Sequence, residues 1–145
     1  MAEFVLTVSS SRPAAVQFAH LVDWDAHSAA IPLTRLRHDG RPRRGQEFVA
    51  RTGLGPLGFD DPMRVELYRP PAGDAPGDLP GVVEIAKSGP VVGGRVRWTV
   101  TPVAGGSVVE WHQLLSIPWL PRWADPLVGV VGRLAYSAGL RRLAA

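Results

Sequence analysis

The chain has 145 residues, of which 46% are hydrophobic and 20% are charged. These ordinary proportions exclude the disordered and fibrous classes, and the length predicts one domain spanning residues 1–145. The sequence contains no cysteine, which excludes disulfides, thiolate nucleophiles and thiolate metal sites.

The basic residues are fifteen scattered arginines and one lysine, and the formal net charge is +3. Their densest cluster, residues 35–44, alternates like a strand and then turns at Asp39-Gly40. This pattern favours a solvated hairpin over a phosphate-binding surface, so we expect no nucleic-acid partner. The amino terminus lacks a basic leader followed by an apolar run, and no later segment stays apolar long enough to span a bilayer. We therefore expect a cytoplasmic protein without a membrane span.

A strand followed by two short helices is predicted at the start of the chain. In residues 3–8 the side chains alternate in a way typical of a half-buried strand. Pro13 pre-sets a helical φ, and the apolar spacing after it predicts a short helix that ends near Val22. Residues 23–32 are predicted to form a second short helix or turn, closed by a proline.

Turn signals then recur at strand-length spacing, and the helical period is lost. Together with the first strand, the segments between the turns predict an antiparallel meander of about seven strands joined by short loops. The longest connection, residues 69–80, is rich in Pro and Gly and is expected to be a mobile surface loop. The further predicted strands span residues 33–38, 46–52, 63–68, 82–87, 95–101 and 107–117.

The tail, residues 123–145, has the only long helical pattern in the sequence. Asp125 suits the capping position and Pro126 the first helical position, and two arginines near the end suit the carbonyl end of the helix dipole. Such a helix needs a sheet to lie on, so we expect a curved sheet to wrap it and to leave an apolar cavity between them. The side chains predicted to face the sheet are Leu127, Val130, Val131, Leu134 and Ala138.

The last two strands indicate which face of the sheet points inward. Trp98 shares a strand face with aliphatic neighbours, and after a Gly-Gly turn Trp111, Gln113 and Leu115 share another. A face that carries two tryptophans is predicted to lie beneath the tail helix. The Pro-rich bridge at residues 118–123 adds two more tryptophans, which can seal the end of the cavity.

Three stretches carry a family resemblance that covers essentially the whole chain. Ser-Arg-Pro13 follows the opening strand, Leu-Val-Asp-Trp-Asp-Ala-His-Ser-Ala-Ala-Ile-Pro fills residues 21–32, and the segment 93–111 has the form of a penultimate hairpin. In these stretches the sequence resembles small bacterial members of the START-like, or SRPBCC, superfamily. The resemblance implies an α+β helix-grip fold, in which a curved antiparallel sheet of about seven strands surrounds a long carboxy-terminal helix and two short helices follow the first strand.

The same superfamily includes polyketide cyclases and dehydrases, lipid-transfer domains and the birch-pollen allergen group. Its shared motifs are structural and not catalytic. The resemblance therefore implies the fold more directly than it implies any one function.

The predicted ligand site is an apolar pocket with a few polar groups, although its aliphatic members equally fit a close-packed core. Gln113 is an amide between two large apolar neighbours, and burying it without partners is costly. We therefore predict that it is either a ligand contact or half of an internal hydrogen bond. The candidate ligand-binding residues are Trp98, Trp111, Gln113, Leu115, Met63, Val65, Leu127, Val130, Val131 and Leu134; no catalytic or metal-binding residue is assigned.

Metal-type ligands occur at His20, Asp23, Asp25 and His27, within eight residues. The segment crosses a helix end and lacks the HxxxH and HExxH spacings, so we predict packing or surface hydrogen bonding for His27 and no metal or other cofactor.

Glu110 and His112 form a possible acid and base pair on one strand face. They lie opposite Trp111 in the alternation, so they face solvent if the tryptophan faces inward, and a slip of one residue would reverse this. By the same alternation Arg95 and Arg97 are expected on the convex face, and an inward arginine would imply an acidic ligand.

Asp60 and Asp61 are predicted to be turn residues. The glycine run at residues 53–58 lacks the lysine and the following helix of a phosphate-binding loop. We expect a flexible rim there, and its apolar side chains could act as a lid over the cavity: Leu54, Leu57 and Phe59.

The first functional hypothesis is the binding of a small hydrophobic or aromatic molecule, such as a lipid or a polyketide-like compound, in the cavity. The alternative is a cyclase or aromatase type of enzyme acting there, with shape and an inward polar group polarising a carbonyl. A second alternative is a dimeric partner-binding module that uses exposed Trp119 and Trp123. The expected state is a monomer or a homodimer.

Overall fold

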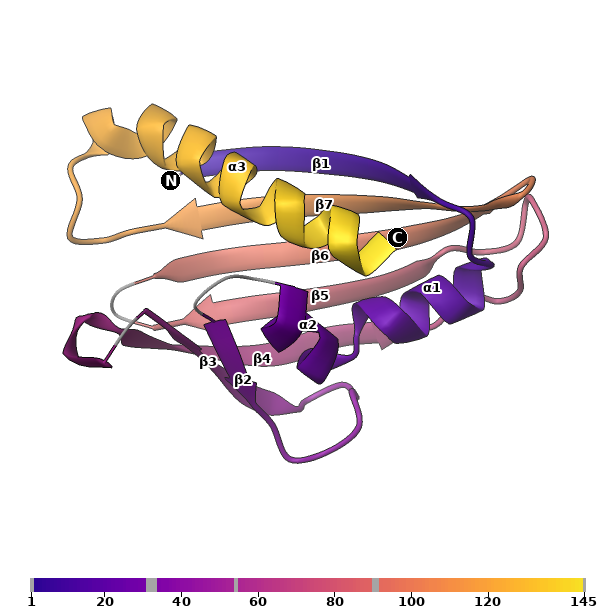
Figure 1. Cartoon of the computed structure of the whole chain (residues 1–145), viewed down its shortest axis with the longest axis horizontal. Coiled ribbons are helices and arrows are strands. Elements are labelled where there is room, and N and C mark those ends of the chain that lie inside the picture. Colours follow the sequence, from indigo (N-terminus) through magenta and orange to yellow (C-terminus); the bar gives the residue numbers. More distant parts are fainter. Residues whose placement is uncertain (1, 31–33, 54, 90–91, 145) are drawn as a thin grey trace.

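The computed structural model (Figure 1) describes every residue except 1, 31–33, 54, 90–91 and 145. The described strands are β1 (Ala2–Ser10), β2 (Thr34–Arg37), β3 (Glu47–Thr52), β4 (Phe59–Arg69), β5 (Gly81–Ser88), β6 (Gly93–Val103) and β7 (Gly106–Ser116). The described helices are α1 (Ala14–Leu21), α2 (Trp24–Ala30) and α3 (Asp125–Ala144), with 3-10 turns η1 (Gly55–Leu57) and η2 (Arg122–Ala124).

These strands form one antiparallel sheet in the order β1-β7-β6-β5-β4-β3-β2. Each strand from β2 to β7 pairs with the next in the chain, and β1 joins the edge beside β7. The sheet curves, and α1, α2 and α3 lie across one of its faces (Figure 1). This arrangement confirms the predicted α+β helix-grip fold. No described helix is both long enough and apolar enough to cross a membrane.

The β6–β7 hairpin sets the inner face of the sheet, as the alternation predicts. Trp98 lies directly opposite Trp111 in the register, and Val96 lies opposite Gln113. All four side chains are buried. Because alternate residues of a strand point to opposite faces, the intervening charged residues lie on the outer side of the sheet.

Buried hydrogen bonds attach the end of α3 to the other end of the chain. Ser10 Oγ donates to Gln17 Oε1 at 2.8 Å, and Gln17 Nε2 donates to the Leu143 carbonyl oxygen at 3.0 Å. Arg12 Nη1 also donates to that carbonyl, at 3.1 Å. The last carbonyls of a helix have no partner within it, so β1, α1 and the segment between them provide the cap for α3.

The prediction for the buried face of α3 is wrong. The side chains expected to face the sheet are exposed: Leu127 by 64%, Val130 by 57%, Val131 by 57% and Leu134 by 69%. The other expected member of this face, Ala138, is also exposed. The buried residues of the helix are instead Gly132, Gly139, Leu140, Leu143 and Ala144.

The glycines explain the choice of face. A Cβ atom on Gly132 would lie only 3.0 Å from the Phe4 ring, so the helix backbone approaches β1 closely where the glycine has no side chain. At about 100° per residue, the buried residues lie on the opposite side of α3 from the exposed aliphatic stripe. The helix is therefore apolar on two faces, and periodicity alone does not show which one is buried.

The prediction that Asp60 and Asp61 lie in a turn is also wrong. Strand β4 begins at Phe59 and contains both residues, and Asp61 is buried. Phe59 likewise belongs to the strand, and Leu57 in η1 is 88% exposed. Leu54, the remaining residue of the predicted lid, lies outside the described residues. A closing movement of this rim stays a prediction.

Candidate functional site

A cavity lies between the concave face of the sheet, α2 and α3. Its volume is about 60 Å³. One water needs on the order of 10–15 Å³ of such space, whereas sites for drug-sized ligands occupy roughly 300–1,000 Å³. In this form the cavity accommodates a few waters or one small group, so a larger ligand requires the walls to move apart. The lining residues are Trp24, His27, Thr34, Leu36, Phe48, Ala50, Thr52, Asp61, Met63, Ile85, Lys87, Val96, Trp98, Trp111, Gln113 and Tyr136.

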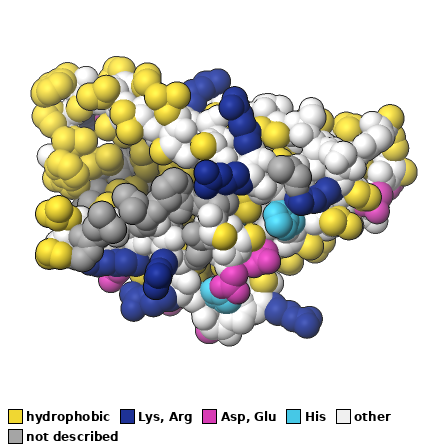
Figure 2. All heavy atoms as spheres, viewed as in Figure 1, with side chains coloured by type: hydrophobic (Ala, Val, Ile, Leu, Met, Phe, Trp, Pro, Cys, Tyr) yellow, Lys and Arg dark blue, Asp and Glu magenta, His cyan; other side chains and the backbone are white. Residues whose placement is uncertain are grey.

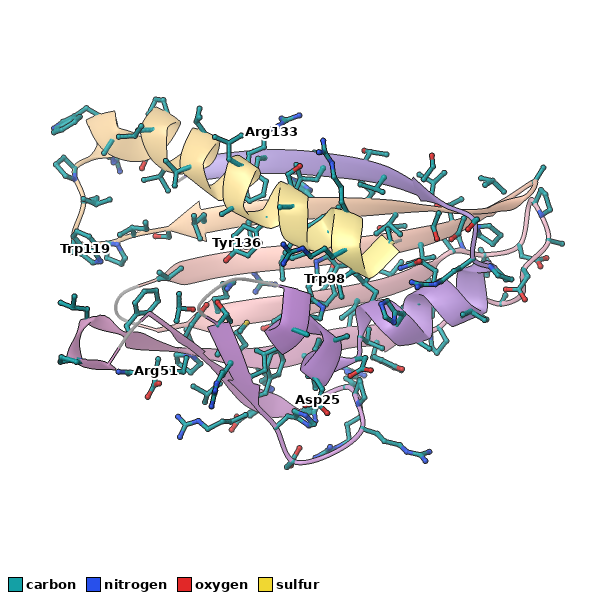
Figure 3. The ribbon with its side chains drawn as sticks, in the orientation of Figure 1. Asp25, Arg51, Trp98, Trp119, Arg133 and Tyr136 are labelled. Carbon is teal, nitrogen blue, oxygen red and sulfur yellow. The ribbon has the colours of Figure 1, made fainter. Side chains whose placement is uncertain are left out.

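Aromatic rings form most of one continuous wall. His27 of α2 stacks on Trp98 of β6 with ring centroids 4.9 Å apart, and Trp98 meets Trp111 of β7 edge to face at 5.1 Å. Tyr136 of α3 packs against Trp111 at 5.2 Å. Figure 3 shows Tyr136 pointing from α3 toward the sheet, on the side where Trp98 lies. Such ring pairs stabilise a packed core by more than their area alone, and here they also fix the cavity wall.

Gln113 forms an internal hydrogen bond, one of the two roles predicted for it. Its Oε1 accepts from the Trp111 indole N–H at 3.0 Å. Its amide nitrogen makes only a long contact of 3.5 Å, to the Leu114 carbonyl oxygen. Because Gln113 also lines the cavity, this weakly used amide N–H group remains available as a donor to a ligand.

A buried ion pair lies in the cavity wall. Lys87 Nζ and Asp61 Oδ2 are 2.5 Å apart, and each side chain is only 7% exposed. The strand register explains the meeting, since Lys87 lies opposite Met63 and Asp61 lies on the same face two residues earlier. Burial acts to lower the pKa of the Lys87 ammonium, but Tyr136 and Asp61 beside it raise that pKa above its ordinary value. The Lys87 side chain therefore carries its positive charge at neutral pH.

Two polar atoms on the wall have no hydrogen-bond partner among the described residues: Asp61 Oδ1, an acceptor, and Trp98 Nε1, a donor. Both belong to residues that line the cavity. A buried polar group without a partner costs about 1–3 kcal/mol, so this donor and this acceptor favour a polar molecule inside.

The His27 side chain is buried and uncharged. Its Nε2–H donates to the Leu21 carbonyl oxygen. Burial lowers the pKa of His27 from 6.5 to about 4, although the hydrogen bond to Leu21 opposes the shift. The packing role predicted for this histidine is thus seen. Asp25 interacts with His38 instead, at 3.0 Å, and the described residues contain no cluster of three or more His, Cys, Asp or Glu side chains able to hold a metal.

The structure brings together four of the predicted site residues, Met63, Trp98, Trp111 and Gln113. Leu115 and Val65 are buried but are not among the cavity-lining residues. The four α3 candidates, which are exposed on the far side of the helix, do not line it either. Whether any of these residues binds a ligand stays a prediction.

Sequence reasoning missed Lys87, Tyr136 and the inward role of Asp61. For Lys87 a signal was present, because it continues the inward alternation of Val83 and Ile85 in β5. Tyr136 has no comparable local signal, since its position depends on the face that α3 buries.

The outward-facing groups lie where the alternation predicts. His112 Nε2 is 2.6 Å from Glu3 Oε1 at the surface. Arg95 pairs with Glu66 at 2.7 Å and Arg97 with Glu84, all on the outer face. Among the described residues that line the cavity, the basic side chain is therefore a lysine and not an arginine.

Comparison with solved structures agrees with this architecture. The protein TTHA0849 from Thermus thermophilus has a TM-score of 0.71 and is 12% identical, covering 97% of this chain and 93% of that chain. The Zhui aromatase/cyclase from Streptomyces sp. R1128 has a TM-score of 0.65 and is 13% identical, covering 97% and 90%. The di-domain aromatase/cyclase StfQ of the steffimycin biosynthetic pathway has a TM-score of 0.68 and is 18% identical, covering 99% of this chain and 49% of StfQ.

The class that these likenesses define is the helix-grip fold. The chain shares that fold with polyketide aromatase/cyclases and with the protein MLL2253 from Mesorhizobium loti. Neither the protein-family models nor the curated protein sequences gave a match.

His27 predicts a specific loss of stability in acid. The unfolded chain takes up a proton near pH 6.5, whereas the folded chain resists protonation down to about pH 4. Within this window the unfolded state binds more protons, so stability falls as the pH falls, by about 3 kcal/mol in total. Urea unfolding between pH 7 and pH 4 measures it. His27→Gln places an amide N–H where the imidazole Nε2–H donates to Leu21 but does not titrate, so between pH 7 and pH 4 its unfolding free energy should fall by about 3 kcal/mol less than that of the unchanged chain. Parallel pH profiles would contradict the assignment.

The buried ion pair predicts strong coupling between its partners. Lys87→Met or Asp61→Leu leaves one uncompensated buried charge, and each single change should cost about 3–5 kcal/mol of unfolding free energy. The double variant has no charge to bury and should be far less destabilised than the sum of the two. Denaturant unfolding of the four proteins measures the coupling. Additive costs would mean that the two charges do not compensate each other.

Proposed function

We propose that the chain binds a small, oxygen-bearing hydrophobic molecule, aromatic or polyketide-like, in the cavity between the sheet and α3. The observation that carries this proposal is the pair of unpartnered atoms on the aromatic wall, Asp61 Oδ1 and Trp98 Nε1. A carboxylate oxygen seeks a donor and an indole N–H seeks an acceptor. A neutral hydroxyl supplies both, and the surrounding rings suit the apolar body that carries it.

The charges favour a neutral ligand over an anionic one. Lys87 is already compensated by Asp61. A ligand carboxylate would therefore add a second negative charge in a buried site, close to the Asp61 oxygen that remains open. Desolvating that charge without a free cation is costly.

The small volume limits what enters the closed form. A cavity of about 60 Å³ holds the polar end of a ligand, while the remainder requires the mouth to widen. The incomplete packing of α3 supports such movement, because none of its residues before Gly132 is among the buried ones.

Matched fragments test the proposal. Phenol, toluene and benzoate share one ring, and phenol alone brings a neutral hydroxyl. We expect phenol to bind most tightly, benzoate least, with binding followed by NMR titration or calorimetry. Trp98→Phe keeps a ring but removes the open N–H, so it should weaken phenol binding roughly tenfold and leave toluene nearly unchanged. Trp111→Phe is the matched comparison, because it removes the same part of a ring from the wall but an N–H that Gln113 already uses, so any change should be equal for phenol and toluene. The proposal fails if no fragment binds or if toluene matches phenol.

A second candidate is a cyclase-type reaction in the same cavity, favoured by the convergence of Lys87, Asp61 and Gln113 on it. The cavity would hold a reactive conformer, and the Lys87 ammonium and the Trp98 N–H would stabilise negative charge developing on a carbonyl oxygen. The likeness in fold to StfQ and Zhui, which are aromatase/cyclases, supports this candidate.

Turnover separates the two candidates. A short poly-β-ketone thioester incubated with the protein should yield a cyclised product under the enzyme hypothesis. The double variant Asp61→Leu/Lys87→Met should then lose that product while remaining folded. Binding of the substrate without any cyclised product would favour the binding function alone.

A further inference from the structure

A continuous apolar stripe covers the solvent side of α3 and the link before it. We call it the α3 stripe and define it by six side chains. In Figure 2, hydrophobic side chains gather where the first half of α3 and the preceding link lie in Figure 1. The members and their exposed fractions are Trp119 64%, Trp123 80%, Leu127 64%, Val130 57%, Val131 57% and Leu134 69%.

The α3 stripe is separate from the cavity. Its four helical members recur at i, i+3, i+4 and i+7, which places them along one edge of the helix. The residues that pack on the sheet, such as Leu140 and Leu143, lie on the opposite side. A large exposed apolar patch on a folded chain indicates a surface that contacts something else.

Positive charge surrounds the α3 stripe. Residues 119–144 contain four arginines and one acidic residue, Asp125. Arg122 lies between the two tryptophans, and Arg133 projects from α3 at the surface (Figure 3). At about 100° per residue, Arg141 and Arg142 continue the exposed edge beyond Leu134. The exposed edge of α3 is therefore apolar along the stripe and basic beyond it, at Arg141 and Arg142.

We infer that α3 docks on an anionic lipid bilayer, lying in the plane of its surface. Tryptophans prefer the headgroup boundary, aliphatic side chains enter the acyl region, and arginines attract anionic lipid. A second copy of the chain fits less well, because residues 119–144 of that copy would offer one acidic residue, Asp125, to the four arginines. The helix lies on the membrane and does not cross it.

Vesicle binding by the full chain tests the inference. Binding should appear with equal mixtures of phosphatidylcholine and phosphatidylglycerol, be weak with phosphatidylcholine alone, and fall at high salt. Leu127→Ser/Leu134→Ser should reduce vesicle affinity at least about tenfold, because the serines bury much less apolar surface in the lipid than the leucines do. Arg141→Gln/Arg142→Gln should reduce it by about thirtyfold and remove about half of the salt dependence, since Arg122 and Arg133 remain.

The control is Leu79→Ser, since Leu79 is 63% exposed but lies in the connection between β4 and β5. It should bind vesicles like the unchanged chain. The leucine variants should unfold within about 0.5 kcal/mol of the unchanged chain, because their side chains are already in water. Equal vesicle binding by all variants, or no binding to anionic vesicles, would overturn the inference. So would a dimer, seen by sedimentation, that the leucine changes dissociate.

Discussion

The pairing of Trp98 with Trp111 across β6 and β7 is the contact on which the rest of the structure depends. The two indoles meet edge to face on the concave face of the sheet. A ring from one helix packs against each indole. His27 brings α2 onto Trp98, and Tyr136 brings α3 onto Trp111. Because both helices dock through these rings, the same contacts that complete the core also form the cavity wall. A register slip of one residue would turn both indoles outward and remove both docking points.

An aromatic wall of this kind restricts what polar groups can do beside it. Each one must find a partner within the fold or within the cavity. The Trp111 indole N–H donates to Gln113, and the Trp24 indole N–H donates to Gln46 at 2.9 Å. Lys87 forms an ion pair with Asp61. After these pairings, one buried donor and one buried acceptor remain open on the wall within the described part of the chain. Under the proposed binding function, the polar recognition of a ligand would therefore fall mainly to Trp98 and Asp61, beside the weakly used Gln113 amide, while the other rings would supply shape.

The fold could be predicted because turns and strand alternation depend on neighbouring residues in the sequence and not on tertiary partners. Glycine-rich turns at strand-length spacing mark the meander, and the alternation around Trp98 and Trp111 marks the inner face. The site was only partly predictable, because its charged members depend on tertiary partners. Asp61 lies in an Asp-Asp-Pro sequence that favours a turn, yet pairing with Ala50 of β3 and the ion pair with Lys87 of β5 hold it in a strand. Lys87 continues the inward-facing alternation of Val83 and Ile85 in its strand. A search for hydrophobic residues does not select it, because it is charged.

Helix α3 shows why an apolar stripe is insufficient to identify a buried face. Bulky aliphatic residues define the most obvious stripe, but close packing against β1 requires the smallest side chains, and Gly132 provides that approach beside Phe4. Once the glycine side is buried, Leu140 and Leu143 follow it into the core because they share its face. The aliphatic stripe then remains on the outside. One helix thus carries two independent surfaces, one that closes a cavity through Tyr136 and one that faces away from it, and the two can evolve or be altered separately.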